Sequence, residues 1–241
     1  PTPGGGGGSG RRASGVRPPT SADGYAATYF PWLVTVDPVT GAQVTTPPSG
    51  HLAGVWARTD GTRGVHKAPA GIGAPVVGAI DLTRRVSQGE QELLNPAGIN
   101  CIRFFSGEGI RVWGARTLAP EASEFRYIPV RRLTNLIKES ILAGTRWAVF
   151  EPNHQPLWAA LRRDVSAFLD LVWRDGALVG ATPEQAFFVK CDAETNPAQV
   201  RDAGMVVTVV GIAPVKPAEF VVFNIMQSAD AADLSATGVL R

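Results

Sequence analysis

The residues best suited to chemistry in this sequence lie together in the segment Glu151–His154, which reads Glu-Pro-Asn-His. Carboxylates and imidazoles carry protons in hydrolases, and we expect this segment between a buried strand and a helix, where α/β enzymes often place catalytic groups. Asn153 and Pro156 also suit a helix start, because an Asn side chain caps the first turn and Pro fits its first position. Helix capping is the favoured interpretation. An α/β hydrolase-like enzyme with a site near Glu151–His154 is the alternative.

Other catalytic motifs are missing from the sequence. A phosphate-binding loop of the GxxxxGK[ST] type requires a Gly-Lys pair, and the chain contains none. The segment Gly107–Gly109 resembles the start of a dinucleotide fingerprint, but it lacks the third glycine and the following helix, so a hairpin turn explains it better. Neither HExxH nor GxSxG occurs. None of the three histidines has a partner at metal-ligand spacing: His51, His66 and His154. The sequence therefore predicts no enzyme, no metal and no cofactor.

The composition of the chain disfavours further classes of function. A total of 23 basic residues against 21 acidic ones leaves a formal charge of +2, too small to imply a nucleic-acid partner or a membrane surface. With 44% hydrophobic residues the chain can bury a core. No apolar run approaches the ~18 residues of a membrane span. Cys101 and Cys191 lie far apart without CxxC spacing, which predicts buried free thiols. We expect a soluble protein without nucleic acid and without direct membrane insertion.

Local patterns predict the secondary structure of the first half of the chain. Residues 1–24 are rich in Gly, Pro and Ser and predict a flexible arm or linker. The expected elements are strands over residues 29–36, 99–105 and 110–117 and helices over 48–59 and 87–94. Ser87 and Glu90 fit a capping box at the start of the second helix. The last two strands flank a Gly-containing turn and predict a hairpin.

From residue 129 onward, apolar residues recur at three- and four-residue spacing, the period of helices that bury one face. Pro129 and Pro156 suit first helical turns, while Gly144 and Gly176 are placed to end the two helices. Strands are expected over residues 146–150, 186–191 and 204–213. Strands that alternate with helices of this length predict an α/β fold. We expect a mixed β-sheet flanked by helices, with extended N- and C-terminal arms.

The final strand, Glu219–Gln227, is apolar on both sides. Asn224 is its single interior polar residue, because apolar side chains occupy both alternating sets: Phe220, Val222 and Met226 on one side and Val221, Phe223 and Ile225 on the other. Pro214 and Pro217 stiffen the preceding connection and disfavour a tight hairpin with residues 204–213. Such a strand is either central in its own sheet or donated to the sheet edge of another subunit. Residues 228–241 are small and polar and predict a loose tail.

Several long segments resemble contractile tail sheath proteins, a family found in contractile phages, R-type bacteriocins and phage-derived contractile injection systems. The resemblance spans residues 29–227 and includes LNPAGINCIRFF at 94–105, FLDLVWRDGALVGATPEQAFFVKCDAETNP at 168–197 and APVKPAEFVVFNIMQ at 213–227. It implies a structural subunit that stacks in six-fold rings around an inner tube and contracts to drive the tube through a target envelope. It carries over no catalytic residue, and residues 25–227 would form the sheath domain.

The resemblance also implies partners and a location. Baseplate and terminal cap proteins would join the homo-oligomer and the inner tube, in a virion tail or phage tail-like particle assembled in the bacterial cytoplasm. The strand Glu219–Gln227 would enter a neighbour's sheet as an inter-subunit linker, together with an N-terminal arm strand from another subunit. Here a Gly-rich stretch stands where the family has a longer N-terminal chain.

In this family, a helix of the inner domain attaches the sheath to its tube. Two arginine pairs are candidates for this contact: Arg162 and Arg163 on the helix from residue 156, and Arg131 and Arg132 on the helix from residue 129. A solvated helix face is the alternative interpretation of both pairs. Because the chain has no nucleotide site, the work of contraction would come from interfaces that repack between two arrangements.

Overall fold

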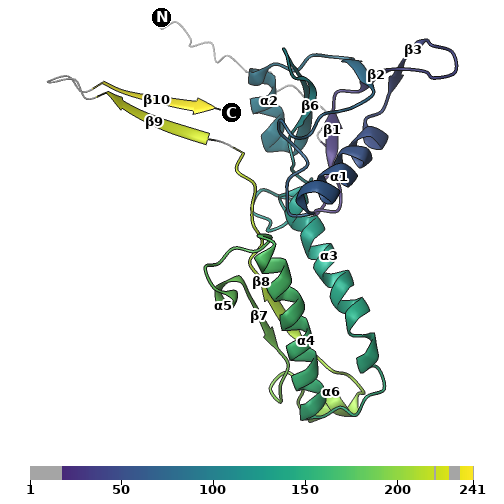
Figure 1. Ribbon diagram of the computed structural model, residues 1–241, viewed down its shortest axis with the longest axis vertical. Coiled ribbons are helices and arrows are strands. Elements are labelled where there is room, and N and C mark those ends of the chain that lie inside the picture. Colours follow the sequence, from purple (N-terminus) through teal and green to yellow (C-terminus); the bar gives the residue numbers. More distant parts are fainter. Residues whose placement is uncertain (1–17, 220, 228–233, 241) are drawn as a thin grey trace, which may run out of the picture.

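The computed structural model describes residues 18–219, 221–227 and 234–240. Residues up to about 127 form one part of an elongated molecule, with two small sheets and the helices beside them. Residues 128 to about 215 form a second part around two long helices, and the last two strands project away from both parts (Figure 1). The described strands are distributed over four small sheets. This mixture of helices and sheets confirms the α/β prediction.

Two three-stranded sheets build the first part. One has the order β1–β5–β6, with bounds Thr28–Phe30, Ile99–Phe105 and Gly109–Trp113. The other has the order β3–β2–β4, with bounds Gln43–Thr46, Leu33–Val36 and Ala79–Leu82. Strand β1 is parallel to β5, and β5 and β6 form the predicted antiparallel hairpin. Helix α1 (Ser49–Arg63) buries Leu52 and Val55 in one apolar cluster with Leu33 of β2 and Ile102 of β5.

Local signals were reliable for the helices of this part. Helix α1 covers the expected range, and α2 (Gln88–Leu94) begins with the predicted capping box of Ser87 and Glu90 before one 3-10 turn, η1 (Asn95–Ala97). The single strand expected over residues 29–36 was wrong, because Pro31 and Trp32 separate β1 from β2 and the two strands enter different sheets. Pro31 has no N–H to donate, so the ladder of β1 ends there.

The N-terminal arm expected over residues 1–24 differs in the structure. Residues 1–17 lie outside the described residues. Ser21 donates its amide to the Leu118 carbonyl at 2.9 Å. Gly24 has a φ of +70°, and a Cβ there would lie 2.7 Å from the carbonyl oxygen of Phe125, so only glycine fits against this loop. Residues 18–24 are therefore fastened to the body of the molecule instead of forming a flexible linker.

Two long helices and a two-stranded sheet build the second part. Helices α3 (Ile128–Gly144) and α4 (Gln155–Arg174) confirm the periodicity, and each has Pro in its first turn. The antiparallel sheet consists of β7 (Phe187–Lys190) and β8 (Val209–Ile212), with the short helices α5 (Pro183–Ala186) and α6 (Ala198–Asp202) in the connections. The shared core includes Leu133 and Ile137 from α3 and Val165 and Leu169 from α4, packed against the inner face of the sheet.

The buried strand expected over residues 146–150 was wrong. The segment is the connection between the two long helices and contains one 3-10 turn, η2 (Arg146–Ala148). Phe150 has a φ of +70° and a side chain that is fully exposed, at 102% of the reference area. Two antiparallel helices need only a short turn between them, so the apolar residues of this segment have no sheet to enter.

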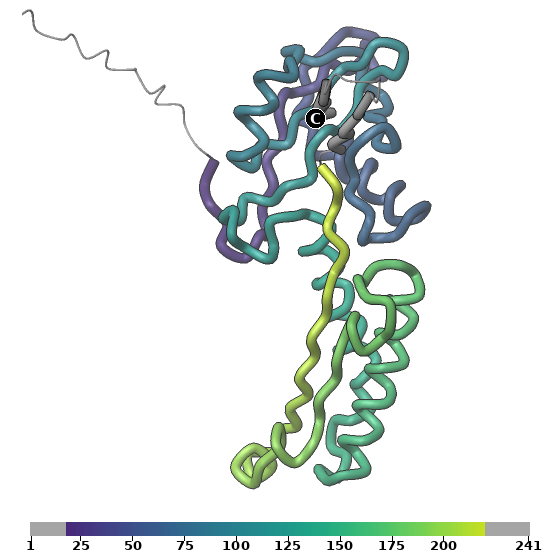
Figure 2. The backbone as a smooth tube through the Cα atoms, turned by 90° about the vertical axis from the view of Figure 1, so that its left-hand side faces the viewer, coloured from purple at the N-terminus to yellow at the C-terminus, as the bar shows by residue number. Residues whose placement is uncertain are grey.

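After β8 the chain runs as an extended connector along the second part and reaches the first part, as Figure 2 shows. Strand β9 (Val221–Gln227) then pairs antiparallel with β10 (Leu234–Leu240) along the full length of both. The tail expected to be loose over residues 228–241 therefore contains a strand. An exposed strand edge offers main-chain hydrogen bonds to any extended segment, which the polarity of the tail did not reveal.

The structure bears on two expectations from the sequence, which concern the cysteines and membrane-spanning helices. Cys101 and Cys191 are both buried free thiols, as predicted. Over the described ranges, no helix is long and apolar enough to cross a membrane.

Candidate functional site

The strand predicted over Glu219–Gln227 is present and begins at Val221. Among the described strands, β9 pairs with β10 alone, and it joins none of the other three sheets. One edge of β9 is thus occupied by β10, and the other edge has no described strand beside it. Phe220 lies outside the described residues, as do the side chains of the strand: Val221, Val222, Phe223, Asn224, Ile225, Met226 and Gln227.

Glu219, the residue at the base of this strand, is held by Arg116. The Arg116 Nε donates to both carboxylate oxygens of Glu219, at 2.9 and 3.0 Å, and Nη2 bonds to Oε2 as well. The two side chains are only 11% and 13% exposed. Sequence reasoning missed Arg116, because a single arginine after a strand carries no signal and its partner is more than a hundred residues away.

The outer edge of β8 is open. Ala213 donates its amide to the Ala186 carbonyl at 2.8 Å, which sets the alternation of main-chain groups along the strand. Val209 and Gly211 therefore direct their N–H and C=O groups toward β7, whereas Val210 and Ile212 direct theirs away from it. Within the described residues β8 has a strand neighbour on its β7 side alone. The edge at Val210 and Ile212 can therefore accept another strand.

The outer edge of β7 is partly closed. Phe187 donates its amide to the Pro183 carbonyl of α5, and Arg162 donates from Nη1 to the Cys191 carbonyl at 2.8 Å. On the β8 side, the buried Asn196 continues the ladder past the end of β7, because its side chain accepts from the Val207 amide at 2.6 Å and donates to the Val207 carbonyl at 3.0 Å. These contacts keep residues 207–212 extended and leave the outer edge of β8 as the more accessible one.

The outer face of this small sheet carries exposed apolar side chains beside Lys190. Phe188 is 57% exposed and its ring lies across Gly211 on the neighbouring strand, where a Cβ would meet the ring at 2.0 Å. Met205 and Val209 are 51% and 42% exposed. Exposed apolar side chains beside an open strand edge are typical of a surface that another protein covers.

The four arginines predicted to face a tube have different environments. Arg131 is buried and bonds Asn135, Tyr25 and the Asp23 carbonyl, so it fastens the N-terminal segment to α3 instead of facing another molecule. Arg132 forms two hydrogen bonds to Asp60 of α1.

On α4, Arg162 is exposed, but its guanidinium is bonded to the main chain at Cys191. Arg163 bonds the adjacent Asp164, and its side chain is 74% exposed. Of the four arginines, Arg163 is thus the one most available to a partner.

The segment Glu151–His154 does not form a catalytic arrangement. Glu151 and His154 are both exposed, and the buried strand expected before them is absent. His154 occupies the N-cap position of α4 without a side-chain cap. Asn153 was expected to cap the helix, but its side chain accepts from Trp158 Nε1 at 2.8 Å and donates to the Met205 carbonyl at 2.7 Å. Nothing here supports the hydrolase alternative.

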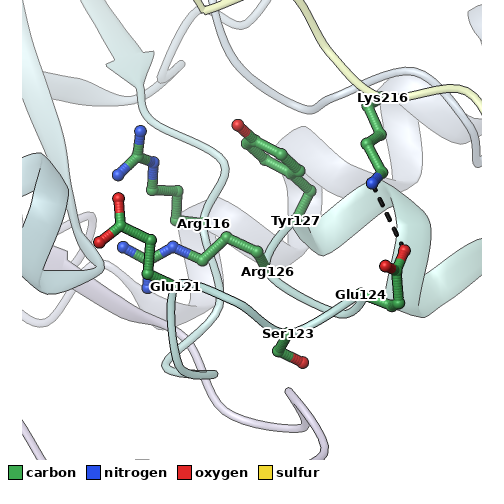
Figure 3. Close-up of a pocket in the computed structure, with 7 residues that line it drawn as sticks. All are labelled: Arg116, Glu121, Ser123, Glu124, Arg126, Tyr127 and Lys216. Carbon is green, nitrogen blue, oxygen red and sulfur yellow. Dashed lines mark hydrogen bonds and ion pairs between the residues drawn. The ribbon is translucent and has the colours of Figure 1, made fainter.

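A pocket lies elsewhere, at the junction between the two parts of the molecule. It has a volume of about 270 Å³ and is lined by charged and polar side chains, shown in Figure 3: Arg116, Glu121, Ser123, Glu124, Arg126, Tyr127 and Lys216. The described part of the chain contains no group of three or more His, Cys, Asp or Glu residues that could hold a metal ion.

Comparisons with known proteins account for most of the chain. Residues 20–118 match the phage tail sheath protein central domain, and residues 121–228 match the phage tail sheath C-terminal domain. The tail sheath protein of Vibrio phage KVP40 is 28% identical over 190 residues, which are 78% of this chain and 27% of that protein. The tail sheath protein of Enterobacteria phage T4 is 27% identical over 188 residues, which are 78% of this chain and 28% of that protein.

Solved structures give the same result. A chain of the anti-feeding prophage baseplate is 37% identical, with a TM-score of 0.77, and the match covers 87% of this chain and 59% of that one. A chain of the PVC extracellular contractile injection system, in the contracted sheath complex, is 39% identical with a TM-score of 0.76, over 87% of this chain and 57% of that one. The chain therefore spans less than two thirds of the length of each of these relatives.

Proposed function

This chain belongs to the contractile tail sheath family, and on that premise we propose that it is a structural subunit of a contractile sheath. In this proposal the subunits stack as six-fold rings around an inner tube, and contraction drives the tube through a target envelope. The role needs no catalytic step. The observation that carries the proposal is the combination of a strand outside the sheets of the body, β9, with an open strand edge on the body, β8.

The link between subunits is proposed to be strand addition. The free edge of β9 from one subunit would pair with the outer edge of β8 in the next, where Val210 and Ile212 offer unused main-chain groups. Each such outward residue can exchange two hydrogen bonds with an added strand, one through its N–H and one through its C=O. The exposed apolar side chains of Phe188 and Val209 lie on the face of the sheet that the addition would extend.

Attachment to the tube is proposed through the exposed face of α4, with Arg163 as the contacting residue. Its side chain is 74% exposed, whereas Arg131 and Arg132 are engaged within the subunit. A contact of this kind must release during contraction, and exposed ion pairs suit that requirement because each contributes little, about 0–1 kcal/mol. The substitution Arg163→Glu should leave the fold intact and weaken the co-sedimentation of sheath with tube.

The energy for contraction would be stored at assembly. If contraction buried ~100 Å² more apolar surface per subunit, each would gain about 2.5 kcal/mol, and a lattice of many subunits sums these gains. The further partners would be baseplate and terminal cap proteins. The location would be a virion tail or phage tail-like particle, assembled in the bacterial cytoplasm.

Removal of residues 220–227 and everything after them tests the proposal. The truncated chain should remain folded, because β9 contributes to no sheet of the body, but it should no longer form tubes. Negative-stain electron microscopy distinguishes the outcomes, since the intact chain should give ringed, striated cylinders. Cylinders from the truncated chain, with the same spacing, would exclude β9 as the link between subunits.

An enzyme would behave differently. The paired substitution Glu151→Gln and His154→Gln should leave both assembly and particle function unchanged, because both residues are exposed and outside the proposed contacts. A variant that assembled normally into particles without function would restore the enzymatic alternative.

A further inference from the structure

The base of the C-terminal strand is fastened at two points on opposite parts of the molecule. At the first point, Val215 donates its amide to the Ala177 carbonyl at 3.1 Å, within the second part. At the second, Glu219 is bonded by the Arg116 guanidinium, within the first part. Between them, Lys216 and Glu124 form an ion pair at 3.4 Å, and their side chains are 54% and 81% exposed. Such a pair contributes little to holding the connector.

Arg116 is positioned in advance for this contact. Asn100, which is fully buried, accepts from the Arg116 amide at 2.7 Å and donates to the Arg116 carbonyl at 2.7 Å. The guanidinium also donates to the Asn95 carbonyl at 3.2 Å. These contacts keep the guanidinium in place whether or not the connector lies beside it. Because a buried cation without a counter-charge is costly, Arg116 requires a carboxylate partner in either case.

A second carboxylate is available to the same cation. Glu121 is exposed and lines the pocket with Arg116, and in Figure 3 its carboxylate lies by the guanidinium groups of both Arg116 and Arg126. Burial acts to lower the pKa of Arg116, but hydrogen bonding and charge from Glu219, with smaller contributions from Tyr127 and Glu121, raise it overall. The charge of Glu121 therefore already acts on Arg116 while Glu219 occupies the bonded position, and it acts on the neighbouring Arg126 as well.

We infer that Arg116 is a latch with two alternative partners, Glu219 when the C-terminal strand is held and Glu121 when it is released. Losing a buried pair is costly chiefly because one charge is left without a partner, and Glu121 removes that cost. When Arg116 releases Glu219, the last residue of the connector that is bonded to the body is Val215. Four more residues of extended chain lengthen the reach of β9 by about 14 Å. A subunit could then keep its strand in a neighbour while the two bodies change their spacing.

The idea that the released strand stays in a neighbouring subunit rests on the proposed function, but the latch itself does not. The test is therefore made on unassembled subunits of the whole chain. Nitroxide labels are placed at Ser106→Cys and Ala218→Cys, both exposed, while the two native cysteines are buried. Electron–electron double resonance should give one narrow distance distribution in the parent chain and a distribution several times broader in Glu219→Gln. A narrow distribution in Glu219→Gln would overturn the latch.

Partner exchange is tested by thermal melting of Glu121→Gln, Glu219→Gln and the double variant. Glu121→Gln alone should melt like the parent, and Glu219→Gln should lose only a few degrees because Glu121 replaces it. The double variant should lose at least about 4 °C more than the sum of the single losses. Additive losses would exclude exchange. Glu124→Gln is the matched control from the same pocket, and it should change neither the melting temperature nor the label distances.

Discussion

The proposed acceptor edge can be blocked with one substitution, Val210→Pro. Val210 directs its N–H and C=O away from β7, so proline at this position removes a donor that the subunit does not use within its own ladder. The proline ring would also keep an incoming strand at a distance. The matched control is Val209→Pro on the same strand, because Val209 lies opposite Lys190 and directs its main chain toward β7.

The magnitude follows from the bonds that an added strand would form. An outward residue exchanges two main-chain hydrogen bonds with its partner, and each contributes about 0.5–1.5 kcal/mol net. Losing both costs about 2 kcal/mol per contact, which corresponds to a roughly 30-fold higher critical concentration for polymerisation. The fold should tolerate the change with a loss of a few degrees in melting temperature, since the partly buried Val210 is replaced by a ring of similar size.

Sedimentation of polymer from serial dilutions gives the critical concentration, and circular dichroism gives the melting temperature. Val210→Pro should stay folded and assemble poorly, whereas Val209→Pro should lower the melting temperature further because it removes a bond within the subunit. If folded Val210→Pro assembled at the parent's critical concentration, the outer edge of β8 would not be where subunits join.

Three further predictions concern the subunit itself. Replacing Arg132 by Lys should lower the melting temperature by about 2–4 °C, measured calorimetrically, because an ammonium cannot reproduce the two parallel bonds to Asp60. Cys101 should resist alkylation at pH 8 in the folded chain and react after denaturation, because burial raises the pKa of its thiol to about 11; rapid labelling of the native protein would contradict this. The Glu90 carboxyl should titrate near pH 2 by NMR, because the Ser87 amide, foremost among its partners, holds its pKa at about 2 against an ordinary 4.5. Its stabilising contribution should therefore be complete above about pH 4.5 and disappear as the pH falls toward 2, a loss that Glu90→Gln should not show.

Features that depend on neighbouring residues were predictable from the sequence. Ser87 caps the start of helix α2, which was predictable because the capping box needs only residues three apart, and Pro129 and Pro156 mark helix starts for similarly local reasons. The apolar run of the final strand also predicted β9 correctly, to within two residues of its start. The long segments that resemble sheath proteins pointed to the family that the comparisons then confirmed.

Features that depend on distant residues were decided only by the tertiary structure. Residues 146–150 have strand-like composition, yet they turn between two helices and leave Phe150 in solvent. Arg131 and Arg163 are the same residue type on neighbouring helices, but the first is buried under the N-terminal segment and the second is exposed. A side chain's availability depends on which other elements pack against it, and those elements are brought together only by folding.

The same contrast between local and distant residues applies to assembly. Alternation along the chain establishes that a segment can be a strand, because it depends on the residues of that segment alone. Which strand edge stays open is decided by pairing, as when β7 pairs with one edge of β8 and no other described strand pairs with the opposite edge. The partner of Arg116 is decided in the same way, since Glu219 is remote in sequence and adjacent only in the folded molecule.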